Sequence, residues 1–233
     1  HDAVAWAFAR AASAAGVDII QNCEVTGFLS SDSRLQAVET SHGTIEAKQV
    51  ALCVAGHSSP LAARAGVRLP IESIALQAMV TEPLKPVLHT VIGSLVIHAY
   101  ISQSDRGEIV IGGGADPFHS YAQRGILPTA GDNAAAVTEL IPSFSRLRLM
   151  RQWAGVCDIS PDSSPIVGHT PVENLYVSTG WGTGGFKAIP AGGDTLAWTI
   201  ANGSAHELLK PFDLDRFRRG ELIDEGAAAG VAH

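Results

Sequence analysis

A glycine-rich stretch between Tyr176 and Lys187, with the sequence YVSTGWGTGGFK, restricts the possible folds of this chain more than any other segment. A short β-rich run ends at Ser178, and four glycines follow within six residues: Gly180, Gly182, Gly184 and Gly185. Glycines allow positive φ and a close approach of the backbone to a flat or anionic ligand. We expect a loop here and a helix only after Lys187 and Pro190, with an N-terminus that favours negative charge.

The glycine stretch alone leaves two interpretations open. It is either a ligand-binding loop or a tight turn without a ligand, and it lacks the early strand, the immediate helix and the later acid of a dinucleotide fingerprint. Lys187 favours the first interpretation, because a lone cation in the apolar sequence GFKAI would be partly desolvated and able to receive a carboxylate. The alternative for Lys187 is a side chain that extends to solvent.

The composition limits the function classes. The chain has 233 residues, is 46% hydrophobic and carries a formal net charge of −7, which predicts a soluble globular protein of one or two domains. An acidic chain without a Lys/Arg-rich run lacks the basic face of a non-specific nucleic-acid binder, so we expect no nucleic-acid partner. No apolar run approaches the roughly 18 residues of a membrane span, so we expect no membrane partner.

The three cysteines, Cys23, Cys53 and Cys157, lie far apart and form no Cys-x-x-Cys pair. We therefore expect neither a metal site nor a redox dithiol. Apolar neighbours predict that Cys53 and Cys157 are buried thiols. An odd number of cysteines without a disulfide framework fits a reducing cytoplasm.

Hydrophobic periodicity predicts helices and strands in both halves of the chain. The first half begins with an Ala-rich helix over residues 2–15 and includes a short helix at 60–64. Between these helices we expect a meander of short β-rich runs over 17–22, 24–30, 34–40, 43–49 and 50–56.

The second half is predicted to start with three or four antiparallel strands between residues 71 and 114, with a turn at 104–107. A helix over 132–141 ends before Pro142, and a last helix spans 190–201. Asp162 lies in a rigid turn that we interpret as structural. Three more strands are expected at 151–160, 164–170 and 174–181.

Two motifs together resemble a known family. SPDSSPIVG begins at Ser160 and STGWGTGGFK begins at Ser178, and this pair is similar to the C-terminal region of FAD-dependent amine oxidoreductases of the D-amino-acid-oxidase and glycine-oxidase type. Within that family, HDAVAWAFARAA, RGEIVIGGGAD, QWAGVCDIS and GWGTGGFKAIPAGG resemble the β subunits of heterotetrameric sarcosine oxidases. The resemblance runs from residue 1 to about Arg219.

The resemblance implies an α+β/α/β fold: the C-terminal part of an FAD-binding amine-oxidase fold, with a large antiparallel or mixed substrate-domain sheet. The βαβ dinucleotide unit of such subunits is missing from this sequence, and we expect it upstream. The implied division is 1–70 for the remainder of the FAD-binding domain, 71–157 for the substrate domain, 158–220 for a return to the FAD-binding domain, and 221–233 for a flexible tail.

The resemblance also implies two flavins, non-covalent FAD and covalent FMN. His1 matches the histidine that carries FMN in these subunits, and a neutral imidazole is a competent nucleophile towards an oxidised flavin. Without the resemblance, His1 would be read as an exposed terminal residue.

Other cofactor positions carry over from the family by matching motifs. Lys187 matches the cation beside the flavin that holds the substrate carboxylate, and Gly180–Phe186 matches the loop along the flavin ring. Val25 matches a position at the adenine, and Ala55 and Gly56 match small residues near the ribose and pyrophosphate. Simple packing is the alternative for these last three residues.

His98 and Tyr100 stand at period two on a run that we take as the central strand, which predicts that both point to the substrate side. The alternative is that they are satisfied core residues. The sequence GEIVIGGG over 107–114 has no match for the Lys and Tyr of monomeric relatives, so the oxygen-activating group stays open.

The implied function is the β-subunit part of a sarcosine oxidase in the cytoplasm. It would give glycine, a one-carbon unit passed to tetrahydrofolate on another subunit, and hydrogen peroxide. The implied partners are sarcosine and the α, γ and δ subunits, and the 233 residues alone are expected to be inactive. The alternatives are a dehydrogenase of dimethylglycine or proline, and a non-catalytic assembly subunit.

Overall fold

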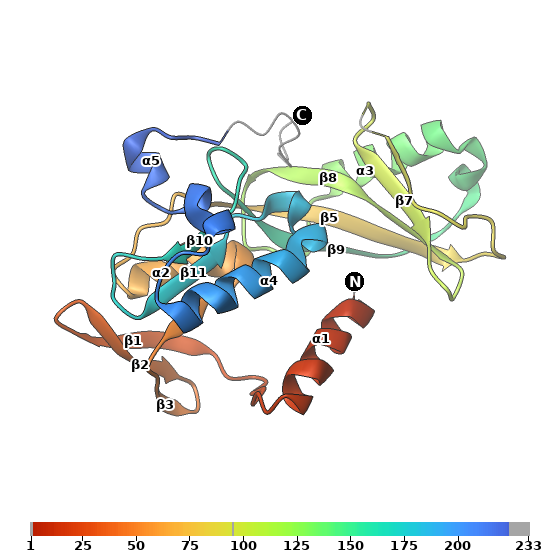
Figure 1. Cartoon of the computed structure of the whole chain (residues 1–233). Coiled ribbons are helices and arrows are strands. Elements are labelled where there is room, and N and C mark those ends of the chain that lie inside the picture. The colour runs from red at the N-terminus through yellow and green to blue at the C-terminus, as the bar shows by residue number, and fades with distance from the viewer. Residues whose placement is uncertain (1, 95, 224–233) are drawn as a thin grey trace.

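The computed structural model describes residues 2–94 and 96–223 (Figure 1). Helix α1 (Asp2–Ala14) comes first, as the Ala-rich periodicity predicts, and none of its residues is buried. Residues 17–22, predicted as a strand, form none. Val17, Ile19 and Ile20 are exposed there, because no neighbouring strand in the described chain pairs with this segment.

A small antiparallel sheet follows, in the order β1-β2-β3. It consists of β1 (Val25–Ser31), β2 (Arg34–Thr40) and β3 (Gly43–Glu46). Leu35 and Ala37 on β2 point inward at period two and are almost fully buried. The predicted meander is therefore confirmed for these three strands.

A second sheet joins distant parts of the chain in the order β10-β11-β4. Its strands are β4 (Val50–Leu52), β10 (Ile166–His169) and β11 (Leu175–Thr179). β11 runs parallel to β4 and antiparallel to β10. After β4 the chain enters the 3-10 turn η1 (Ala55–His57) and helix α2 (Ser58–Arg64), and the side chains of α2 help to cover the core of this sheet.

The third sheet has five antiparallel strands in the order β6-β7-β8-β5-β9. They are β5 (Glu72–Pro83), β6 (Ile92–Ser94), β7 (Ala99–Gln103), β8 (Glu108–His119) and β9 (Leu149–Ile159). Alternate residues of β5, including Gln77, Met79 and Thr81, are fully buried. On this face lie helix α3 (Leu127–Leu140) and the turn η2 (Pro142–Arg146), which pack against Met79 and the buried isoleucines of β7 and β8.

Two sequence predictions are wrong in this region. Helix α3 begins at Leu127, not at residue 132, because Pro128 occupies a first-turn position where its missing N–H costs nothing. His98 does not lie on a strand: it adopts a left-handed φ of 47° in the turn before β7. β7 is next to the edge strand β6, and the central strand is β8.

The C-terminal part returns to the second sheet. After β11 come η3 (Gly182–Gly184), α4 (Gly185–Asn202), η4 (Glu207–Phe212) and α5 (Arg216–Arg219). α4 therefore begins five residues before Pro190, the predicted start. Pro190 stands in the second turn, where its ring removes one helical hydrogen bond without ending the helix.

A buried ion pair joins helix α5 to the turn between β9 and β10. The guanidinium of Arg216 donates to both carboxylate oxygens of Asp162, at 2.8 and 2.9 Å, and to the carbonyl of Ser164 at 2.9 Å. The side chains of Arg216 and Asp162 are 1% and 2% exposed. Desolvation would raise the pKa of Asp162, but hydrogen bonding to Arg216 outweighs it and lowers the pKa to about 2.

The flexible tail predicted for 221–233 falls largely outside the described residues, since 224–233 are not among them. Within the described part, the Ile223 amide still donates to Asp162 at 3.2 Å. In 2–94 and 96–223, no helix has the length and hydropathy needed to cross a bilayer.

Candidate functional site

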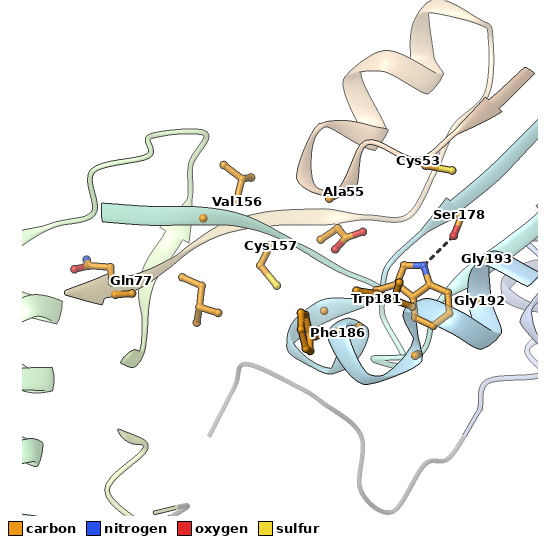
Figure 2. Close-up of a pocket in the computed structure, with 18 of the residues that line it drawn as sticks. Cys53, Ala55, Gln77, Val156, Cys157, Ser178, Trp181, Phe186, Gly192 and Gly193 are labelled. Carbon is orange, nitrogen blue, oxygen red and sulfur yellow. Dashed lines mark hydrogen bonds between the residues drawn. The ribbon is translucent and has the colours of Figure 1, made fainter. Parts of the chain in front are cut away.

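A pocket of about 880 Å³ lies between the five-stranded sheet and the segment that runs from β11 into α4 (Figure 2). We call the two sides the sheet wall and the loop wall. The sheet wall comprises Leu76, Gln77, Ala78, Tyr100, Ser102, Val110, Trp153, Gly155, Val156, Cys157 and Asp158. The loop wall comprises Ser178, Trp181, Gly182, Gly185, Phe186, Ala188, Ile189, Gly192, Gly193 and Leu196. Cys53 and Ala55, which follow β4, also line the pocket.

The loop wall is held from behind by one carboxylate. Asp158, almost fully buried at the end of β9, accepts hydrogen bonds from the Thr179 hydroxyl at 2.9 Å and from the Gly180 amide at 2.6 Å. Gly180 has a φ of 73°, a conformation that favours glycine. Asp158 thus fixes the point at which the chain leaves β11 and turns into the glycine loop.

Trp181 forms the back of the loop wall. Its Nε1 donates to Ser178 Oγ at 2.9 Å (Figure 2). A Cβ added to Gly185 or Gly192 would lie 2.8–2.9 Å from the Trp181 side chain, so the indole fills the space beside both glycines. Gly185 begins the 18-residue helix α4 directly after η3 and lines the pocket, so the positive end of the helix dipole lies beside the pocket.

Two other glycines leave open space in the pocket. A Cβ added to Gly155 on β9 or to Gly193 on α4 would meet nothing within 4 Å. Both residues line the pocket, one on each wall. The missing side chains widen the gap between the walls at these points, which suits a flat ligand.

On the sheet wall, the strand register brings together residues from four strands. Tyr100 pairs with Gly112, Gly112 with Ala78, and Ala78 with Trp153. Because paired residues point to the same face, these four form one row across the sheet. A Cβ on Gly112 would lie 2.4 Å from the Tyr100 hydroxyl, so the phenol ring lies over Gly112. The row is therefore a shallow floor between two aromatic rings.

Desolvation shifts the pKa values of two groups on the sheet wall. It raises the pKa of the Tyr100 phenol, and it raises the pKa of the buried Cys157 thiol to about 11, with the Asp158 charge adding to the effect. Cys157 is thus a buried neutral thiol, as its apolar neighbours predict. Cys53 lines the pocket but is exposed, contrary to the prediction.

The structure brings some of the predicted site residues together and separates others. The pocket is lined by Ala55, Tyr100, Gly182, Gly185 and Phe186. The remaining described candidates are not among the lining residues: Val25, Gly56, His98, Gly180, Gly184 and Lys187. His1 lies outside the described residues.

The candidates that do not line the pocket occupy distinct places. Gly56 packs against β9, where a Cβ would lie 2.3 Å from Val156. Val25 starts β1 in the small first sheet. Lys187 is exposed in the first turn of α4, next in the chain to Phe186.

Sequence reasoning missed three kinds of pocket residue. Trp153 and Gly155 belong to the sequence QWAG, which was quoted only for its resemblance. Gly192 and Gly193 follow Pro190, and two adjacent glycines inside a predicted helix were a usable signal of close approach. No local pattern distinguishes Asp158 from a surface acid, because its partners Thr179 and Gly180 lie about 20 residues further on.

A glycine loop that opens a helix and faces an antiparallel sheet across a wide apolar pocket is the arrangement of a flavin-dependent oxidoreductase. The family model of the FAD dependent oxidoreductases (DAO) matches residues 1–198. The chain belongs to this family.

Two curated relatives are longer than this chain. "Sarcosine oxidase subunit beta" of an Arthrobacter species is 54% identical over 233 residues, which cover 100% of this chain and 58% of that protein. The Rhodobacter capsulatus protein of the same name is 51% identical, with 100% and 56% covered. The chain therefore spans little more than half the length of the curated relatives it matches.

Solved structures share the fold. L-proline dehydrogenase from P. horikoshii superposes with a TM-score of 0.85 at 29% identity, covering 93% of this chain and 59% of that one. Glycine oxidase from Geobacillus kaustophilus gives a TM-score of 0.78 at 22% identity, with 88% and 55% covered. These similarities confirm the expected architecture, a mixed fold with an antiparallel sheet from the DAO family.

Proposed function

We propose that this chain forms the substrate-facing part of an FAD-dependent amine oxidase that acts on sarcosine. The observation that carries the proposal is the pocket between the small-residue floor of the sheet wall and the glycine loop at the start of α4. The similarity to two proteins named sarcosine oxidase subunit beta, at 51–54% identity, supports the choice of substrate.

The residues present fit a flavin. The pocket volume of about 880 Å³ is at the upper end of the range for small-molecule sites, about 300–1,000 Å³. Gly155 and Gly193 leave space on the two walls for a flat ring. When bound, FAD supplies a two-electron acceptor for the hydride that leaves the carbon next to the amine nitrogen.

The chain's own residues would hold the ring and orient the substrate. We propose that Gly180–Phe186 packs along the flavin ring and that the positive end of the α4 dipole favours its electron-rich polar edge. Val25, Ala55 and Gly56 would contact the adenine, ribose and pyrophosphate. Lys187 would bind the substrate carboxylate, which requires its exposed side chain to turn towards the pocket.

We also propose that His98 and Tyr100 lie on the side of the pocket that faces the substrate. Tyr100 stands at the end of the floor, and its raised pKa keeps the phenol protonated and able to donate a hydrogen bond at neutral pH. His98 is two residues away, in the turn before β7. A substrate amine on the floor would lie between the rings of Tyr100 and Trp153, where cation–π attraction favours a positive charge.

Electron transfer between flavins, subunit assembly and transfer of the one-carbon unit are proposed for the full-length protein with its subunits. We propose that it transfers electrons from FAD to FMN attached covalently through His1, and then to oxygen, giving hydrogen peroxide. The α, γ and δ subunits would complete a cytoplasmic heterotetramer, with tetrahydrofolate on another subunit accepting the one-carbon unit. The proposed domain division is 1–70, 71–157 and 158–220.

A dehydrogenase is the second candidate, and one observation favours it: the similarity to L-proline dehydrogenase at a TM-score of 0.85. Such an enzyme would oxidise proline or dimethylglycine and reduce an acceptor other than oxygen. The electron acceptor of the reduced flavin separates the two candidate functions: an oxidase reduces oxygen, and a dehydrogenase reduces another acceptor.

The test uses the flavin-loaded protein with its subunits. We expect sarcosine to bleach the flavin absorbance under anaerobic conditions and to give peroxide in air. Lys187→Met should raise the KM for sarcosine about 10-fold or more and change kcat less. Bleaching by proline but not by sarcosine, without peroxide, would favour the dehydrogenase, and no flavin binding at all would refute both.

A further inference from the structure

Ala78 lies at the bottom of a hollow in the sheet wall. Leu76 and Val80 stand two residues before and after it on β5, so the three side chains point to the same face of the sheet. Across the sheet, Ala78 stands between Gly112 of β8 and Trp153 of β9. Its methyl side chain is shorter than those of Leu76, Val80 and Trp153, so the surface of the wall is lowest at Ala78.

The fourth side of the hollow is formed by Tyr100. The position that a Cβ would take on Gly112 lies 2.4 Å from the phenol oxygen and 2.5 Å from the ring carbon that bears it. The end of the phenol ring therefore takes the place of a Gly112 side chain, and the strands of Gly112 and Ala78 are about 4.8 Å apart. Ala78, Tyr100 and Trp153 all line the pocket, and Ala78 is only half-buried. The hollow is thus one side chain wide and opens into the pocket.

The depth of the hollow suits a methyl group. The side chain of Ala78 ends at its Cβ, whereas those of Leu76 and Val80 extend further by carbon atoms that form the edge of the hollow. Closely packed protein surfaces are sensitive to a change of even one methylene group. A bound methyl group would fill the space above Ala78, and a longer chain would meet the Ala78 Cβ or displace a neighbouring side chain.

The chemistry of amine oxidation directs one part of the substrate into this hollow. In the proposed function the flavin ring lies along the loop wall, so the substrate is held between the flavin and the sheet wall. The carbon that gives up its hydride must direct one C–H bond to the flavin. Because this carbon is tetrahedral, any chain that extends from it points away from the flavin, towards the sheet wall. In sarcosine only hydrogens extend from it, whereas in N-ethylglycine a methyl group does.

We infer that Ala78 is a specificity-determining residue that limits the N-alkyl group of the substrate to a methyl group. The inference deepens the proposed function and rests on it. The N-methyl carbon occupies the hollow, and the side chains of Leu76, Tyr100 and Trp153 prevent a longer chain from bending aside. The same arrangement disfavours proline, because a ring carbon extends from its reacting carbon towards Ala78.

The first experiment compares Ala78→Gly and Ala78→Val with the wild type in the flavin-loaded protein with its subunits. The measured quantity is the ratio of kcat/KM for N-ethylglycine to that for sarcosine. One methylene group changes such a ratio by about 10- to 200-fold in a closely fitting site. We expect Ala78→Gly to raise the ratio about 10-fold, because loss of the Cβ deepens the hollow, and Ala78→Val to lower it about 10-fold.

A binding measurement tests the hollow without turnover. Methylthioacetate and ethylthioacetate carry sulfur in place of the amine nitrogen, so no imine can form, and their dissociation constants are read from the flavin absorption spectrum. The ratio of the ethyl to the methyl constant should fall about 10-fold in Ala78→Gly and rise about 10-fold in Ala78→Val. Ala51→Val is the matched control, because Ala51 is exposed on β4 and is not among the residues that line the pocket. It should change each ratio less than about twofold.

The possible results separate the inference from the proposed function. The two variants are expected to shift the ratios in opposite directions, which a general loss of folding or of flavin cannot imitate. If sarcosine reduces the wild-type flavin but both ratios are unchanged in the variants, or shift in the same direction, the inference is overturned while the proposed function stands. If sarcosine does not reduce the wild-type flavin and neither thioether changes its spectrum, both are overturned.

Discussion

The loop wall and the sheet wall of the pocket are built in different ways. The loop wall is one continuous segment, from Ser178 to Leu196, and hydrogen bonds from behind hold it in place. The sheet wall takes its floor from four strands, and only the register aligns Tyr100, Gly112 and Trp153. We infer that the loop wall depends on a few polar anchors, and that the sheet wall depends on the size of its side chains.

The largest effect is expected at the buried Asp162–Arg216 pair, which joins the turn between β9 and β10 to α5. Asp162→Ala would leave the Arg216 guanidinium buried without its carboxylate, which should lower the free energy of unfolding by about 3–5 kcal/mol. Urea denaturation measures this loss. A loss below about 1 kcal/mol would contradict the idea that polar anchors hold this side.

The same pair predicts a pH dependence. The pKa of Asp162 is about 2 in the folded state and 3.8 in the absence of the fold. Because the folded-state pKa is lowered, the stabilisation is fully present above about pH 4 and is lost as the pH falls towards 2. Stability should fall more steeply between pH 4 and pH 2 in the wild type than in Asp162→Ala, and parallel curves would refute the assignment.

The next largest effect is expected for the carboxylate that holds the glycine loop. Asp158→Asn removes the charge that accepts the Thr179 hydroxyl and the Gly180 amide, and should cost about 1.5–3 kcal/mol. Flavin affinity should fall as well, because the loop loses its fixed starting point. Thr179→Ser keeps a hydroxyl at the same place and serves as the control. A stable Asp158→Asn protein with unchanged flavin affinity would argue against an anchoring role.

On the sheet wall, a single methyl group should be disruptive. Gly112→Ala places a Cβ 2.4 Å from the Tyr100 hydroxyl, and the displacement of the ring should cost about 1–3 kcal/mol. Gly131→Ala, in α3 with no atom within 4 Å, should instead stabilise the protein by about 0.5–1 kcal/mol. Thermal unfolding of the two variants tests whether side-chain size controls this wall. Equal shifts in the two variants would contradict it.

The smallest change in stability is expected on the pocket side of the loop wall. Gly193→Ala adds a helix-favouring methyl group in open space and should raise the stability of the flavin-free protein by about 0.5–1 kcal/mol. The same methyl group enters the pocket, so flavin affinity should fall. Stability and affinity thus change in opposite directions, which isothermal titration and denaturation together measure. If Gly193→Ala raised both the stability and the flavin affinity, the flavin would not bind beside Gly193.

The sequence predicted the elements whose patterns are local. The helix of residues 2–14 and the strands β5 and β8 follow from periodicity over about ten residues. The predicted glycine loop is shorter than expected, because η3 begins at Gly182 and α4 at Gly185. The strand predicted over 17–22 does not form. Val17, Ile19 and Ile20 favour a strand, but no other strand in the described chain pairs with them. The intrinsic β propensity of a segment does not produce a strand where no neighbouring strand forms hydrogen bonds with it.

The pocket residues, too, divide into those that a local sequence pattern predicts and those that only the folded chain brings together. Gly182, Gly185 and Phe186 were found because they are adjacent in sequence, and they line the pocket. Trp153 and Gly112 come together only through the register of β5, β8 and β9, which sequence patterns do not specify. Alternation at period two predicts a shared face for His98 and Tyr100 only if both lie on the strand. Because β7 starts at Ala99, one residue after His98, this prediction does not apply to His98.

The Asp162–Arg216 pair also affects how the protein is made. The turn that contains Asp162 is synthesised 54 residues before its partner arginine. Until Arg216 has left the ribosome, a carboxylate destined for the interior has no counter-charge, so the turn between β9 and β10 stays solvated and open. The five-stranded sheet can form first during synthesis, whereas the glycine loop should reach its final position only after the last described helix has emerged.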